Sequence, residues 1–195
     1  ETGMGKGRLE AFSDGVIAII ITIMVLELRP PEHTEFADLI RLAPTFLAYL
    51  LSFIYVGIYW NNHHHLLHAS GRINGKVLWA NLHLLFWLSL MPFVTAWMGE
   101  NYHATAPVFV YGAVLLLAAI AYVVLQWQLV KSDPKTADRL REALGKDRKG
   151  KVSVAAYLAG MVLAFWQPWL SQLLYTAIAL LWLVPDTRIE RVLQD

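Results

Sequence analysis

The sequence contains no cysteine, which excludes disulfide bonds and thiolate chemistry. Charged residues are also few, at 16% of the 195 positions, and they nearly cancel to a formal net charge of +1. Such a balance offers no basic surface for nucleic acid. Because the chain also has no glycine-rich nucleotide loop and no hydrolytic triad, we expect neither an enzyme nor a cofactor.

Apolar residues are what the chain has in excess. They make up 57% of it, with a mean hydropathy of +0.46, which is too apolar for an ordinary soluble domain. We therefore expect an all-α, polytopic membrane protein with the lipid bilayer as its surroundings. The leading Glu-Thr-Gly before Met4 resembles a cloning remnant, so the expected single domain covers 4–195. Six apolar segments can be drawn, over 8–28, 36–60, 77–98, 106–130, 152–165 and 169–184.

The lengths of these segments test whether each can cross a membrane. A span needs about 20 residues, and the first four segments satisfy this. The last two are shorter and are separated only by Trp166-Gln167-Pro168, which favours a tight turn in a helical hairpin. A re-entrant pair that never crosses the membrane is the alternative.

The positions of basic residues predict the orientation. With six spans, only Arg29 and Arg41 of the 16 lysines and arginines lie on the outer side. Because these residues collect on the cytosolic side, both termini are predicted to be cytosolic. The mixed-charge stretch at 131–151 is interpreted as a cytosolic linker, and a regulatory or lipid-binding role for it is the less favoured alternative.

The first segment has two chemically different sides. From Gly15 to Leu26 its only polar residue is Thr22. At about 100° per helical residue, Ser13 and Asp14 point roughly 120° to 140° away from Ile19. We expect Asp14 to contact neighbouring helices of its own bundle and the Ile19 side to contact something else. The side here called the Ile19 face consists of Arg8, Phe12, Gly15, Ile19, Thr22, Ile23 and Leu26.

The string Arg8-x-x-x-Phe12-Ser13-Asp14 resembles the signature of the transmembrane-protein-175 family of potassium channels. The resemblance implies six spans per unit and a central pore lined by the first helix. A chain with one unit, as here, is similar to the prokaryotic members, which implies a homotetramer in a bacterial plasma membrane. Further parts of the resemblance are Tyr59-Trp60-x-x-His63-His64, Trp79-x-Asn81-Leu82, Leu90-Met91-Pro92-Phe93 and Val184-Pro185-Asp186.

The resemblance also implies where ions pass. The family's path is a constriction of bulky apolar side chains on the first helix, and Ile19, Ile23 and Leu26 fit that pattern here. Thr22 supplies a hydroxyl beside the narrowest ring and is the candidate for selectivity of K⁺ over Na⁺. An apolar neck of this kind can gate by dewetting. Proton conduction is a second activity that the resemblance implies.

Polar residues near the cytosolic end of the first segment are interpreted as a structural network. A carboxylate at Asp14 needs a partner, which Trp60, His63, His64 or Asn81 could supply. Arg8 carries the charge that could close this network, although it lies on the Ile19 face.

The histidines from His63 to His68 leave two other interpretations open. His64 and His68 are one helical turn apart, but no acidic or cysteine ligand is near, so we expect no metal site. A proton-coupled secondary transporter using Asp14 and these histidines is the alternative function. It is disfavoured because no inverted repeat and no broken membrane helix is evident.

Overall fold

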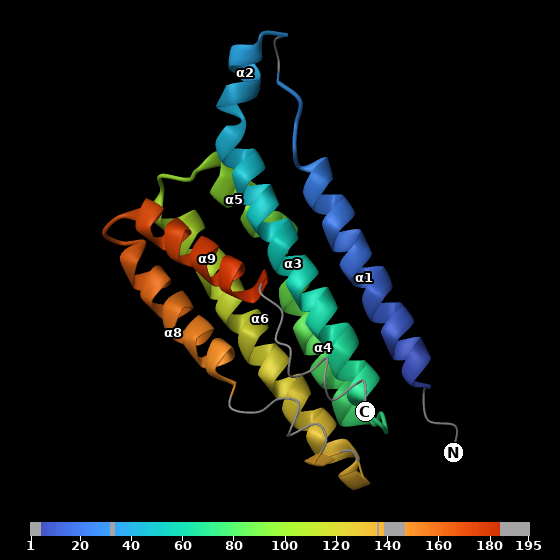
Figure 1. Cartoon of the computed structure of the whole chain (residues 1–195). Helices are drawn as coiled ribbons and strands as arrows, with labels where there is room; N and C mark the ends of the chain where they lie inside the picture. The colour runs from blue at the N-terminus through green and yellow to red at the C-terminus, as the bar shows by residue number, and fades with distance from the viewer. Residues whose placement is uncertain (1–4, 32–33, 136, 139–146, 184–195) are drawn as a thin grey trace.

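The computed structural model describes residues 5–31, 34–135, 137–138 and 147–183, and all regular secondary structure within these ranges is helical. This confirms the predicted all-helical class. The family-like motif at Val184-Pro185-Asp186 and residues 139–146 of the predicted linker lie outside the described residues. The helices, in chain order, are α1 (Lys6–Leu26), α2 (Phe36–Arg41), α3 (Ala43–Ala69), α4 (Gly75–Ser89), α5 (Met91–Glu100), α6 (Thr105–Ser132), α8 (Arg148–Leu163) and α9 (Pro168–Leu183) (Figure 1).

In the part of the chain that the structure describes, four helical stretches are long and apolar enough to cross a bilayer. They are α1, α3, α6 and the combined α4–α5 unit, which covers Gly75–Glu100. These four agree with the first four predicted segments and make this chain a membrane protein. Each of α8 and α9 has 16 residues, or about 24 Å of helix, against about 30 Å of hydrocarbon. The six-span count therefore stays a prediction.

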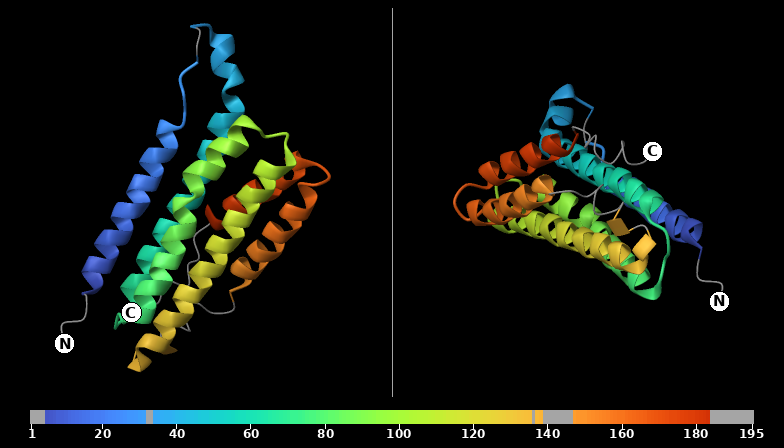
Figure 2. Two further views of the ribbon diagram at one scale, coloured as in Figure 1. Left: turned by 180° about the vertical axis from the view of Figure 1, so that it is seen from behind. Right: turned by 60° about the horizontal axis from the view of Figure 1, so that its bottom comes forward.

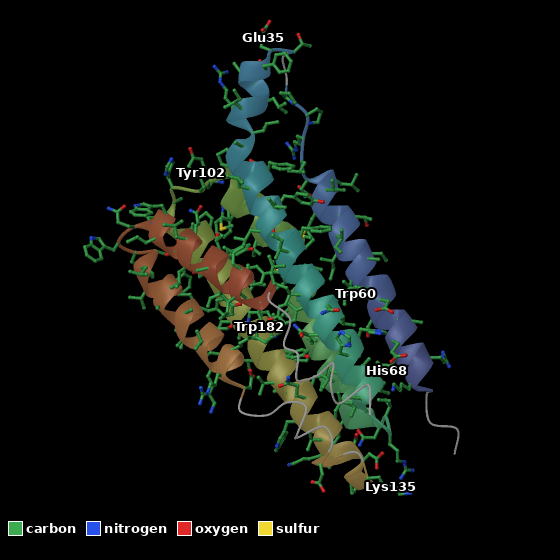
Figure 3. All side chains as sticks on the ribbon, viewed as in Figure 1. Glu35, Trp60, His68, Tyr102, Lys135 and Trp182 are labelled. Carbon is green, nitrogen blue, oxygen red and sulfur yellow. The ribbon has the colours of Figure 1, made fainter. Side chains whose placement is uncertain are left out.

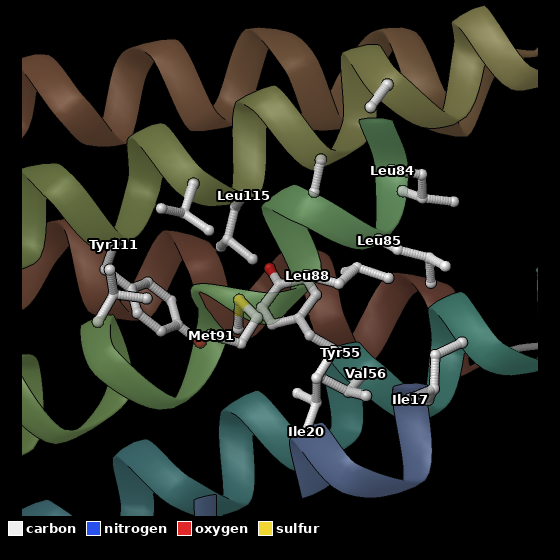
Figure 4. Packing of buried hydrophobic residues seen from close by; sticks show 14 of the residues in the cluster. Ile17, Ile20, Tyr55, Val56, Leu84, Leu85, Leu88, Met91, Tyr111 and Leu115 are labelled. Atoms are coloured by element: carbon white, nitrogen blue, oxygen red, sulfur yellow. The ribbon is translucent and has the colours of Figure 1, made fainter. Parts of the chain in front are cut away.

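The helices form a layered bundle with α1 at one edge and the α8–α9 hairpin at the other (Figures 1 and 2). Helix α6 packs against α4, α5, α8 and α9, and α1 packs against α3, α4 and α5. The centre of the core is filled where α1, α3, α4, α5 and α6 meet (Figure 4). Tyr55, Leu88, Met91, Tyr111 and Leu115 are among its fully buried side chains.

Two predicted segments are interrupted, and in each a proline follows the interruption by two residues. The segment at 36–60 divides into α2 and α3 at Leu42, before Pro44, and α3 continues past the predicted end to Ala69 because His63, Leu66 and Leu67 are buried. The third span divides at Leu90, before Pro92. Proline lacks an N–H and clashes with the carbonyl four residues earlier. The expectation that no membrane helix is broken is therefore corrected for the third span.

Close helix contacts at the α8–α9 end depend on two glycines. Tyr175 of α9 is fully buried between α6 and α8. A Cβ atom added to Gly112 would overlap the Tyr175 hydroxyl, and one added to Gly160 would overlap its ring. Small residues at such points let membrane helices approach closely, so these glycines are needed for the hairpin to pack on α6.

Candidate functional site

Helix α1 is attached to the bundle by one side only. The side chains that pack against the rest of the subunit recur every three or four residues, and each is at most 4% exposed. This spacing fixes which side of α1 is turned inward. The buried side chains are Leu9, Ser13, Ile17, Ile20 and Met24.

The Ile19 face is open in the single chain, as the helical wheel predicted. Ile19 is 58% exposed, Ile23 42% and Leu26 78%. Arg8, Phe12, Gly15 and Thr22 are exposed on the same side. The face is therefore excluded from the interior of its own subunit, while its role as a pore constriction stays a prediction.

Thr22 is the only hydroxyl on the apolar part of this face. Its Oγ1 donates a hydrogen bond to the carbonyl of Ile19 over 2.9 Å. The hydroxyl proton is thereby used within the helix, and the oxygen lone pairs stay available as acceptors. An acceptor without a competing donor is the chemistry that a partly dehydrated cation needs.

Beside α1, a buried polar cluster joins three helices. Asn81 of α4 donates from Nδ2 to Ser13 Oγ of α1 over 2.9 Å, and its Oδ1 lies 2.7 Å from His63 Nε2 of α3. Ser13 in turn donates to the Leu9 carbonyl over 2.8 Å. Since a carbonyl oxygen only accepts, His63 Nε2 carries the proton. We call these three residues the Ser13–Asn81–His63 cluster.

Asp14 has a different partner at the surface. Trp60 donates a hydrogen bond from Nε1 to Asp14 Oδ1 over 3.0 Å. Of the four partners predicted for Asp14, Trp60 is the one that the structure places in hydrogen-bond contact with it. The Trp60 ring also stacks on His64, which stacks on His68. Figure 3 labels Trp60 and His68 on α3. The predicted network is thus two separate groups, because His63 and Asn81 bond within the cluster that holds Ser13.

The histidine stretch has the appearance of an interfacial helix end. Ring centroids of His64 and His68 are 6.1 Å apart with nearly parallel planes. Within the described ranges, no group of three histidine, cysteine or acidic side chains is placed to hold a metal ion. Lys6, at the start of α1, donates to the carbonyls of His68 and Ser70, which ties this end of α1 to the end of α3.

A second buried polar group was missed from the sequence. Thr95 Oγ1 of α5 donates to Ser52 Oγ of α3 over 2.6 Å, and Ser52 lies 2.9 Å from the Tyr111 hydroxyl of α6. Nearby, Tyr55 donates to the carbonyl of Tyr175 over 2.6 Å. The available signal was a set of hydroxyl side chains inside apolar segments, which have to find partners when a lipid-embedded bundle closes.

These features define a class of protein: a polytopic helical membrane protein whose first helix is fixed in rotation by its contacts and leaves one apolar face exposed on the single chain. Comparisons with known proteins then identify the family. A model of the family described as endosomal/lysosomal potassium channel TMEM175 matches residues 8–92, which run from the first turn of α1 to the start of α5. The chain belongs to the TMEM175 family.

Relatives match between about three quarters and nearly all of this chain. A protein of Chryseobacterium sp. named a potassium channel is 51% identical over 192 residues, covering 98% of this chain and 100% of the relative. A Streptomyces collinus potassium channel is 33% identical over 160 residues, covering 72% and 77% of the two chains. The crystal structure of a lysosomal potassium-selective channel TMEM175 homolog from Chamaesiphon minutus superposes with a TM-score of 0.79. It is 29% identical, and the match covers 92% of this chain and 96% of that one.

Proposed function

We propose that this chain forms a potassium-permeable channel, selective for K⁺ over Na⁺, in the plasma membrane of a bacterium. Four copies surround a central pore, each with six spans and cytosolic termini. Support comes from the relatives named as potassium channels and from the location of all but two basic residues on one predicted side. K⁺ is the transported ion in this proposal and no cofactor takes part.

The observation that carries the proposal is the exposure of the Ile19 face. One helix cannot enclose a pore, but several copies of an apolar face around an axis can. Ile19 and Ile23 are separated by about 6 Å along the helix axis, and Ile23 and Leu26 by about 4.5 Å. Four subunits would therefore stack three apolar rings over roughly 10 Å, long enough to expel water when narrow.

The preference for K⁺ over Na⁺ follows from the absence of polar ligands in these three apolar rings. Apolar side chains offer no ligands, so an ion crossing the neck loses part of its water shell without replacement. K⁺ gives up water more readily than Na⁺ does, which favours K⁺ in a widened neck. The Thr22 oxygens, which face outward with Ile19 and Ile23, would replace some of the lost ligands.

The absence of cysteine makes a direct test simple, because every single-cysteine variant is made in a cysteine-free background. Ile19→Cys should react with a charged, water-soluble methanethiosulfonate added to the conducting protein in planar bilayers, and its K⁺ current should fall. The control is Leu180→Cys on α9, which should keep its current. The native Leu180 side chain is 57% exposed, like that of Ile19, but α9 belongs to the hairpin at the opposite edge of the bundle from α1.

Two readouts separate this function from its rivals. Unitary current steps indicate a pore, whereas slow saturable flux without steps would indicate the proton-coupled carrier. A pH-sensitive dye in matched vesicles measures whether protons cross as well. A conducting Ile19→Cys protein that the reagent leaves unchanged would refute the placement of the Ile19 face at the pore.

A further inference from the structure

A groove between α4 and α6 opens at the end of the bundle that Lys135 marks (Figure 3). Its volume is ≈ 1030 Å³. One wall is the first turns of α4 and the other is the last turns of α6. The hydroxyl of Ser132 donates to the Arg72 carbonyl over 2.8 Å, which holds the α3–α4 connection against the end of α6. The two walls are therefore already in place in the free subunit.

The mouth of the groove is basic. Lys76 projects from the α4 wall and Lys131 from the α6 wall, and both are exposed. Among the described residues that line the groove, none is an aspartate or glutamate. The nearby acid Asp133 is buried beyond the end of α6, where it accepts a hydrogen bond from the Lys135 backbone N–H. Two cations without an acid between them attract a negatively charged group.

Further along α4 and α6 from this end, the lining also contains apolar and aromatic side chains. Trp79 is 74% exposed, and Ala80 and Val124 lie beside it. Lys131 Nζ lies 3.4 Å from the ring centroid of Trp127, so its ammonium group is held at the level of an exposed tryptophan. Tryptophans and lysines together at the ends of spanning helices mark the headgroup region of a bilayer.

We propose that this groove is a binding site for an anionic phospholipid of the leaflet at this end of the bundle. Lys76 and Lys131 bind the headgroup phosphate, the Gln128 amide donates to its oxygens, and Trp79 packs against the upper acyl chain. Basic pockets between membrane helices recognise anionic headgroups in this way. A free phosphate would use the lysines alone, and the apolar wall at Trp79 and Val124 indicates the lipid. The assignment of this leaflet as cytosolic rests on the proposed topology, and the site itself does not depend on ion conduction.

The test measures lipid binding to the purified full chain by native mass spectrometry. The wild type should retain phosphatidylglycerol in preference to phosphatidylcholine of the same acyl length. Each lysine near an anionic headgroup strengthens binding about fivefold, so the double variant Lys76→Gln/Lys131→Gln should bind phosphatidylglycerol on the order of thirtyfold more weakly. Lys76→Arg/Lys131→Arg should keep the binding.

A matched control removes the same amount of charge elsewhere on the predicted cytosolic side of the protein. Arg148→Gln/Lys151→Gln changes two exposed basic residues of α8 and should bind like the wild type. Equal weakening in both double variants would overturn the site, as would a wild type without preference for phosphatidylglycerol. That wild-type measurement decides the matter even if a variant fails to fold. Millimolar inorganic phosphate that displaces the lipid completely would show a soluble-anion site and would also overturn the proposal.

Discussion

The Ser13–Asn81–His63 cluster predicts how strongly one side chain holds α1 to the bundle. Asn81 is fully buried and makes two hydrogen bonds to other helices, at 2.9 Å to Ser13 and 2.7 Å to His63. Asn81→Leu keeps the number and branching of the side-chain heavy atoms and removes both bonds. Such bonds between membrane helices contribute about 0.6 kcal/mol on average and up to about 1.7. The two losses together should cost roughly 1–3 kcal/mol, toward the upper end because the His63 N–H is left unpaired in a buried position.

The assay is reversible unfolding of the purified protein in mixed micelles, followed by tryptophan fluorescence. Asn61→Leu is the control, because it makes the same chemical change at an exposed position of α3 and should shift the free energy of unfolding by less than about 0.5 kcal/mol. The double variant Asn81→Leu/His63→Leu should cost less than the sum of the two single variants, since it leaves no unpaired His63 donor. Additive losses, or an Asn81→Leu protein as stable as the control, would refute the cluster as a structural anchor.

Other predictions concern packing, selectivity and assembly. Gly160→Ala should lower the free energy of unfolding by about 1–3 kcal/mol because its methyl group overlaps Tyr175, whereas Gly57→Ala, with open space at its Cβ position, should not; equal effects would contradict this account. Thr22→Ala should lower the K⁺ over Na⁺ permeability ratio while current persists, as measured by reversal potentials under bi-ionic conditions, and an unchanged ratio counts against the role of the hydroxyl. Oxidation of Leu26→Cys should cross-link subunits into dimers on a non-reducing gel if the Ile19 faces meet at an axis, and monomers alone would speak against it.

The exposed side of α1 could be predicted from the sequence because it depends on one helix only. The 100° step separates Ile19 from Ser13 whatever the rest of the chain does, and the structure has Ile19 exposed and Ser13 buried. The lengths of the first four apolar segments are similarly local quantities, and they were enough to identify a membrane protein.

The pairing of polar residues could not be predicted in the same way. Whether Asn81 contacts Asp14 or Ser13 depends on how α1, α3 and α4 cross. Because residues 13 and 14 are adjacent in the chain, a small change in the crossing decides between them. The helical-wheel prediction correctly separated both residues from Ile19. It did not show that Ser13 lies inside the contact between α1 and the neighbouring helices while Asp14 lies at the margin of that contact. The division at Leu90 had a visible cause in the sequence, because Pro92 lies two residues after it.

The anchoring of Ser13 limits how a pore built on the Ile19 face could open. Rotation of α1 about its own axis would break the hydrogen bond between Asn81 and Ser13. It would also remove four buried side chains from their contacts with the neighbouring helices: Leu9, Ile17, Ile20 and Met24. Widening of the pore would therefore require whole subunits to tilt away from the axis as rigid bodies. Alternatively, α1 could bend after Ser13, where Gly15 has open space at its Cβ position.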